Sequence, residues 1–117
     1  GVSCIDWHPT EHNLLAAVTL KTNRLEIWRI DTGEMISIMD LISEGSEERV
    51  AQIAWSPHSP SLLLCRVADR ADLLLVDYKA ETKKAVPTFR IVVTHFSWNP
   101  RVPNSILFAD GDFGLLF

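Results

Sequence analysis

The sequence predicts an all-β protein, an incomplete β-propeller of about two and a half to three four-stranded antiparallel blades. Two observations support this fold class. The motif Trp-x-Pro occurs three times, at Trp7, Trp55 and Trp98, with spacings of 48 and 43 residues. Short apolar runs bounded by Pro, Asn, Asp and Gly separate these motifs, and no run carries an apolar stripe of helical period. A strand-rich repeat of this length is typical of propeller blades.

The repeat extends well beyond the tryptophans. When Trp7 is placed over Trp55, apolar positions coincide without gaps over residues 2–30 and 50–78. The third copy matches the start of the first at Val93, Phe96 and Trp98.

The first unit is expected to contain four strands. They run over Val2 to Trp7, Leu14 to Thr19, Leu25 to Ile30 and Met35 to Leu41. Alternation supports the third strand, because Leu25 and Ile27 fall on one face and Glu26 falls on the other.

The second unit begins at Val50 and continues with strands over Leu62 to Val67 and Leu73 to Tyr78, followed by a weak strand near Thr88. The third unit reaches Phe117 inside its third strand, after a hairpin turn over Asp110 to Gly114. Residues 1–117 are therefore expected to form part of one propeller, with blade units of approximately 1–48, 49–91 and 92–117. Since closed propellers have about 4–8 blades, we expect the chain to belong to a longer protein, with the rest of the propeller on both sides.

Two positions connect the repeat with a known family. Trp28, at the end of a third strand, is followed by Arg29, and the equivalent pair in the second unit is Val76 and Asp77. These pairs and the Trp-x-Pro turns resemble the WD-repeat family over essentially the whole chain. No unit has the complete Trp-Asp pair or the Gly-His pair, so the buried hydrogen-bond network of that family is not carried over.

The third unit has a more distinctive sequence than the other two. Its sequence, FSWNPRVPNSILFADGDFGLLF, resembles the last blade of replisome adaptors of the chromosome-transmission-fidelity type. That resemblance implies a nuclear protein of DNA replication that tethers factors near chromatin. Degenerate propellers of intraflagellar transport, vesicle coats and ubiquitin ligases share the pattern, so these roles stay open.

The Trp-x-Pro motifs are expected to be structural. Each Trp ends an innermost strand and wedges between adjacent blades, while Pro lacks an N–H group and ends the strand ladder. The expected structural residues are Trp7, Pro9, Trp28, Trp55, Pro57, Trp98 and Pro100.

Sequence motifs for catalysis or metal binding are weak. His8 and His12 have the spacing of a helical zinc site, but Pro9 disfavours helix at His8, and His58 and His95 have no neighbouring ligand in sequence. A DFG triplet lacks the other kinase motifs. We therefore expect no catalytic, metal-binding or cofactor-binding residue and no enzyme. The alternative is a ligand-binding or catalytic propeller with its site at the central channel.

Composition restricts the partners. Net charge is −4, with no basic stripe for nucleic acid, and no apolar run approaches the roughly 20 residues that insert into a membrane. Cys4 and Cys65 are too few for a disulfide framework, which favours an intracellular protein, nuclear or cytoplasmic.

Polar loops supply the expected binding surface. Loops 21–24, 43–49, 69–72 and 110–112 join second to third strands or successive units, so they share one face of the propeller. WD-repeat propellers commonly bind proteins or peptides there, and the resemblance implies a non-catalytic interaction scaffold with a mixed-charge rim. The expected rim residues are Lys21, Arg24, Glu44, Glu47, Glu48, Arg49, Asp69, Arg70, Asp72, Asp110 and Asp112.

Overall fold

The computed structural model describes residues 1–110 and 114–116, which form three antiparallel sheets. The first sheet contains β1 (Val2–Trp7), β2 (Leu14–Thr19), β3 (Arg24–Arg29) and β4 (Glu34–Asp40). The second contains β5 (Val50–Trp55), β6 (Leu62–Val67), β7 (Asp72–Asp77) and β8 (Thr82–Pro87). The third contains β9 (His95–Trp98), β10 (Ile106–Asp110) and β11 (Gly114–Leu116). Strands pair in chain order within each sheet, so every sheet is a meander of hairpins.

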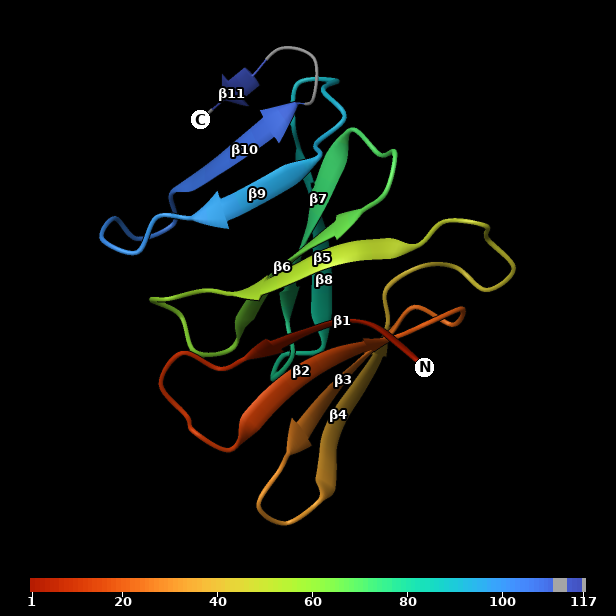
Figure 1. Cartoon of the computed structure of the whole chain (residues 1–117), viewed down its shortest axis with the longest axis vertical. Helices are drawn as coiled ribbons and strands as arrows, with labels where there is room; N and C mark the ends of the chain where they lie inside the picture. Colours follow the sequence, from red (N-terminus) through yellow and green to blue (C-terminus); the bar gives the residue numbers. More distant parts are fainter. Residues whose placement is uncertain (111–113, 117) are drawn as a thin grey trace.

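The three sheets stand side by side in a flat arc measuring 44 × 38 × 22 Å. The first strand of each sheet contacts the first strand of the next, β1 against β5 and β5 against β9 (Figure 1). This is the arrangement of successive propeller blades around part of a ring, as the sequence predicts.

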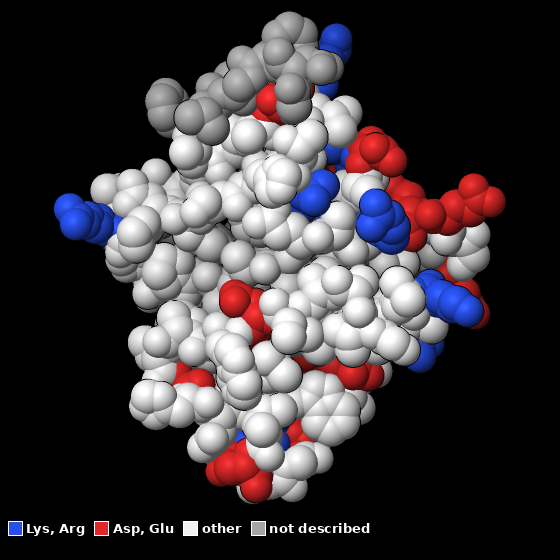
Figure 2. All heavy atoms as spheres, viewed as in Figure 1, with Lys and Arg blue, Asp and Glu red and all other residues white. Residues whose placement is uncertain are grey.

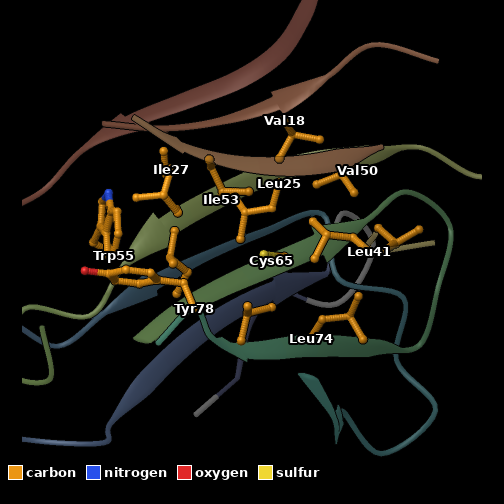
Figure 3. Close-up of a cluster of buried hydrophobic side chains, with 14 of the residues drawn as sticks. Val18, Leu25, Ile27, Leu41, Val50, Ile53, Trp55, Cys65, Leu74 and Tyr78 are labelled. Atoms are coloured by element: carbon orange, nitrogen blue, oxygen red, sulfur yellow. The ribbon is translucent and has the colours of Figure 1, made fainter. Parts of the chain in front are cut away.

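Strand alternation gives each sheet one face for the preceding sheet and one for the following sheet. In β5, Ile53 and Trp55 point into the core shared with the first sheet, while Gln52 and Ala54 point toward the third. The larger core lies between the first two sheets and includes Trp55 and Tyr78, whose rings meet edge to face with centroids 5.6 Å apart (Figure 3). A smaller core between the second and third sheets is formed by Leu64, Leu73, Val93, Phe96 and Phe108.

The last strand of the second sheet lies earlier than predicted. The strand covers Thr82–Pro87, whereas the sequence placed a weak strand near Thr88. Nearly every residue of β8 is exposed, so this outer strand lacks the apolar alternation that identifies the others. Thr88 follows the strand, is buried, and donates its hydroxyl to the carbonyl of Ile91 at 2.7 Å.

The third sheet follows the predicted pattern as far as it is described. β11 pairs antiparallel with β10, which supplies the expected third strand. Residues 111–113 of the expected hairpin turn, including the rim residue Asp112, and Phe117 lie outside the described residues.

Candidate functional site

The three Trp-x-Pro turns share a hydrogen-bond pattern that explains their middle residue. In each turn the side chain between Trp and Pro accepts two backbone N–H groups. In the first turn, His8 Nδ1 accepts from Thr10 at 3.2 Å and from Glu11 at 3.0 Å. In the second, Ser56 Oγ accepts from His58 at 3.2 Å and from Ser59 at 3.1 Å. In the third, Asn99 Oδ1 accepts from Arg101 at 2.9 Å and from Val102 at 3.1 Å. The motif therefore encodes a self-capped turn at the end of each innermost strand.

His8 also joins the first two sheets. Its Nε2 lies 2.8 Å from the carbonyl oxygen of Pro60, and its ring meets the Trp55 ring edge to face with centroids 4.6 Å apart. Because Nδ1 accepts the turn N–H groups, Nε2 is the nitrogen that donates to Pro60. Both ring nitrogens serve the structure. The described residues contain no group of three or more His, Cys, Asp or Glu side chains suited to a metal ion.

Two of the tryptophans make hydrogen bonds between neighbouring sheets. Trp55 is 4% exposed, and its indole donates to the backbone oxygen of Asp6 at 3.0 Å. Trp98 is half-buried and donates in the same way to Ala54 at 3.1 Å.

The other two tryptophans lie on the opposite face of the first sheet, so Trp7 does not wedge between two of the described sheets. Trp7 is 55% exposed, because no sheet covers its side of β1 among the residues that the structure describes. Trp28 is half-buried on the same side of the first sheet, and its indole donates to Glu26 Oε1 at 3.1 Å.

Asp6 places a carboxylate at the interface of the first two sheets. Its Oδ2 accepts the backbone N–H of Trp55 at 2.9 Å. Desolvation by burial raises the pKa of Asp6 above its ordinary value of 3.8, and hydrogen bonds from the backbone of Trp55 and Trp7 oppose that rise.

Gln52 makes the corresponding polar contact between the second and third sheets. Its side-chain amide donates to the carbonyl of Phe96 at 2.9 Å and accepts the Phe96 N–H at 3.2 Å. Arg66 donates to Gln52 Oε1 and to the carbonyl of Val93, both at 3.4 Å. Sequence reasoning gave Gln52 and Arg66 no role.

Three of the four loops of the predicted rim, those of the first two sheets, lie together on the side opposite the Trp-x-Pro turns (Figure 1). We call the rim the surface formed by residues 20–24, 41–49 and 68–72. Asn23, another residue that sequence reasoning missed, connects two of these loops. It is buried with a φ of 52°, donates to the Glu48 carbonyl at 3.0 Å and accepts the Val50 N–H at 2.9 Å. A lone Asn in a turn was the available signal, since Asn tolerates positive φ.

Ion pairs connect part of the rim to itself and to β4. Arg70 lies 2.9 Å from Asp72 and 3.7 Å from Glu48, while Arg24 lies 2.9 Å from Asp40, which the sequence did not single out. The remaining rim side chains on the described loops are exposed: Lys21, Glu44, Glu47, Arg49 and Asp69. Asp110 is half-buried at the end of β10.

Three hollows follow the rim from the first sheet to the second. Their volumes are about 140, 240 and 300 Å³. The first two share Ile42 and Ser43, and the second and third share Glu48. Acidic and basic side chains gather along this edge of the molecule (Figure 2). We call this row of three adjacent hollows, whose linings carry charges of both signs, the rim furrow.

Comparisons with known proteins give the fold. No protein-family model matches the sequence, and neither does any curated protein. A chain of the mitotic checkpoint complex is 23% identical and superposes with a TM-score of 0.72 over 97% of this chain and 35% of that chain. The WD40 domain of Toxoplasma gondii coronin is 15% identical, with a TM-score of 0.76 over 97% of this chain and 30% of that chain. The chain thus spans about a third of each and has the fold of part of a WD40 propeller.

Proposed function

We propose that the chain is part of a WD-repeat propeller that acts as a non-catalytic scaffold and binds a protein or peptide partner along its rim. The rim furrow, a row of three adjacent hollows, is the observation that carries this proposal. Its walls are fixed, because Asn23 joins loop 20–23 to the start of β5 and Arg70 joins β7 to loop 41–49.

The furrow suits an extended segment of polypeptide with charges of both signs. Leu41, Ile42 and Leu74 line its middle part together with Lys83 and Lys84. Protein interfaces commonly combine apolar residues, which leave water on binding, with charged residues, which fix the orientation of the partner. The proposed binding residues are Lys21, Arg24, Glu44, Glu47, Glu48, Arg49, Asp69, Arg70, Asp72, Asp110 and Asp112.

A narrower role is part of the proposal. The resemblance of residues 92–117 supports a replisome adaptor such as the acidic nucleoplasmic DNA-binding protein, which implies a nuclear setting. Transport, coat and ubiquitin-ligase assemblies are the competing settings. No helix within the described ranges is long and apolar enough to cross a membrane.

Site-specific photo-crosslinking in the protein at its natural length tests the rim. A photoreactive residue replaces Glu44 on the rim or Glu11 on the face of the Trp-x-Pro turns, both exposed. We expect a protein crosslink from position 44 and none from position 11. Crosslinks from position 11 alone would move the binding surface to the other face.

The charge of the rim is tested with the partner that crosslinking identifies. The double variant Arg24→Glu, Arg49→Glu should weaken binding at least about tenfold, because both side chains are exposed on the rim. Arg70 is left unchanged because it holds Asp72. The control is Arg101→Glu, an exposed residue in the third Trp-x-Pro turn, which should leave the affinity unchanged.

A further inference from the structure

The three hollows of the rim furrow differ in the charge of their lining side chains. We number them from the first sheet to the second. Hollow 1 has two basic and two acidic residues, so its lining is balanced. Hollow 2 has three basic residues and one acidic residue, a formal charge of +2, whereas hollow 3 has one basic and three acidic residues, a formal charge of −2. The charged residues are Lys21, Arg24, Asp40 and Glu44 in hollow 1, Glu48, Arg70, Lys83 and Lys84 in hollow 2, and Glu47, Glu48, Arg49 and Asp69 in hollow 3.

An ammonium group is fixed at the wall of hollow 2. Lys83 Nζ donates to the backbone oxygen of Asp40 at 3.0 Å and to that of Leu41 at 3.4 Å, so this side chain reaches from β8 to the end of β4. Within the described part of the chain, Lys83 forms no ion pair with a carboxylate. Because an ammonium has three N–H donors, one donor of Lys83 remains for a partner. Two neutral carbonyl groups thus hold the ammonium in place and leave its charge uncompensated.

The other two basic residues of hollow 2 are less available to a partner. Arg70 lies 2.9 Å from Asp72 and 3.7 Å from Glu48, so neighbouring carboxylates already compensate its charge. Lys84 follows Lys83 in β8, and successive side chains of a strand point to opposite faces. Lys83 is therefore the cation that hollow 2 offers.

An apolar surface lies beside this cation. Leu41, Ile42 and Leu74 line hollow 2 and are 2%, 7% and 6% exposed. Leu41 and Leu74 lie at the same end of the core between the first two sheets (Figure 3). The hollow, of about 240 Å³, is enclosed by residues 41–48 and 70–85, all of which the structure describes. A fixed cation next to an apolar surface suits an acidic side chain that is adjacent to an aliphatic one.

We propose that the partner of the rim is a peptide segment that places one aspartate or glutamate side chain in hollow 2, beside an aliphatic residue, and that its carboxylate pairs with the ammonium of Lys83. The inference rests on the proposed function and adds the chemistry of the segment. Charge directs the carboxylate to hollow 2, because hollow 3 would repel it and hollow 1 is balanced. The same repulsion at hollow 3 disfavours a polyanion such as a nucleic acid.

Random peptides displayed on phage, selected on the protein at its natural length, are the probes. The selected peptides are synthesised, and those that crosslink to a photoreactive residue at position 44, in hollow 1, are kept as rim peptides. We expect the rim peptides to share an acidic residue next to an aliphatic one. Rim peptides without a common acidic residue would overturn this inference and leave the proposed function standing. If no selected peptide crosslinks from position 44, both are wrong.

Substitutions of Lys83 test the ion pair with these rim peptides. Lys83→Glu should weaken their binding at least about tenfold, because it sets two carboxylates against each other. Lys83→Gln removes the charge but keeps a donor for the β4 carbonyls, and it should weaken binding about threefold. Lys79→Glu is the matched control, an exposed lysine in the turn before β8 that lines none of the three hollows, and it should leave the affinity unchanged.

A charge exchange separates the ion pair from a structural effect of Lys83. A rim peptide with its acidic residue replaced by lysine should bind the Lys83→Glu protein at least about tenfold more tightly than the unchanged peptide does. A loss in Lys83→Glu that the exchanged peptide does not recover would show that Lys83 acts only by holding β4. Unchanged affinity in both Lys83 variants would show that the carboxylate does not bind in hollow 2.

Discussion

The indole N–H of Trp55 donates to the backbone oxygen of Asp6 at 3.0 Å, while the Asp6 carboxylate accepts the backbone N–H of Trp55 at 2.9 Å. Two residues on neighbouring sheets thus exchange two hydrogen bonds, with the Trp55 ring packed between His8 and Tyr78. Removal of this ring should open a cavity and leave polar groups unpaired. We predict that Trp55→Ala lowers the free energy of unfolding by about 3–5 kcal/mol.

Denaturant unfolding measures that loss. Phe89→Ala is the control, because Phe89 is 81% exposed and its removal should change stability by less than about 0.5 kcal/mol. A Trp55→Ala loss as small as that of the control would show that the ring does not hold the sheets together.

The same pair predicts a pH dependence. Because burial raises the pKa of Asp6, the folded protein keeps this proton to a higher pH than the unfolded chain does. The contribution of Asp6 to stability is therefore full below the ordinary pKa of 3.8 and declines as pH rises through the raised value. Asp6→Asn stays neutral and retains an acceptor for Trp55. Its stability relative to the wild type should increase between about pH 3 and about pH 7. Unfolding titrations across this range check the sign, and a difference that falls with pH would contradict it.

The capped turns allow a matched pair of substitutions. Ser56 is buried and accepts two backbone N–H groups, so Ser56→Ala should cost about 1–3 kcal/mol. Asn99→Ser keeps a short side-chain acceptor at the equivalent position and should cost less than about 0.5 kcal/mol. Thermal melts compare the two variants. A loss of less than about 0.5 kcal/mol for Ser56→Ala as well would mean that the side-chain acceptor does not stabilise the turn.

Asn23 gives a prediction for the rim. Asn23→Ala removes a donor to Glu48 and an acceptor for Val50, and it places alanine at a φ of 52°. We expect a loss of about 1–3 kcal/mol and faster amide hydrogen exchange in loop 41–49. Asn23→Gly tolerates the positive φ but lacks both hydrogen bonds, so it separates the two causes. Unchanged exchange in Asn23→Ala would mean that the loop is held by other contacts.

The sequence was sufficient for the strands that are short apolar runs between turn residues. β1, β2 and β6 have the predicted bounds, and β5 begins at the predicted Val50, because the turns beside them contain Pro, Asn or Asp. β8 was placed too late because this exposed outer strand is not an apolar run.

The polar connections were beyond sequence reasoning for a different reason. Asn23 bonds to Glu48 and Val50, and Gln52 bonds to Phe96. These partners are far along the chain, and a polar residue in a turn or strand does not reveal a distant partner. Trp7 and Trp55 carry the same motif with different exposure, because burial depends on the neighbouring sheet.

The hydrogen bonds donated by the tryptophan indoles give the row of sheets a direction. Every step runs from a tryptophan to the carbonyl of the sheet before it, from Trp98 to Ala54 and from Trp55 to Asp6. Any open stretch of such sheets has unlike ends, one with a spare donor and the other with a spare acceptor. Two such stretches can join head to tail but not head to head, so twofold-symmetric pairing through these ends is disfavoured. Only a closed ring leaves neither the spare donor nor the spare acceptor unpaired. Closure is therefore a condition that all the sheets of the ring meet together.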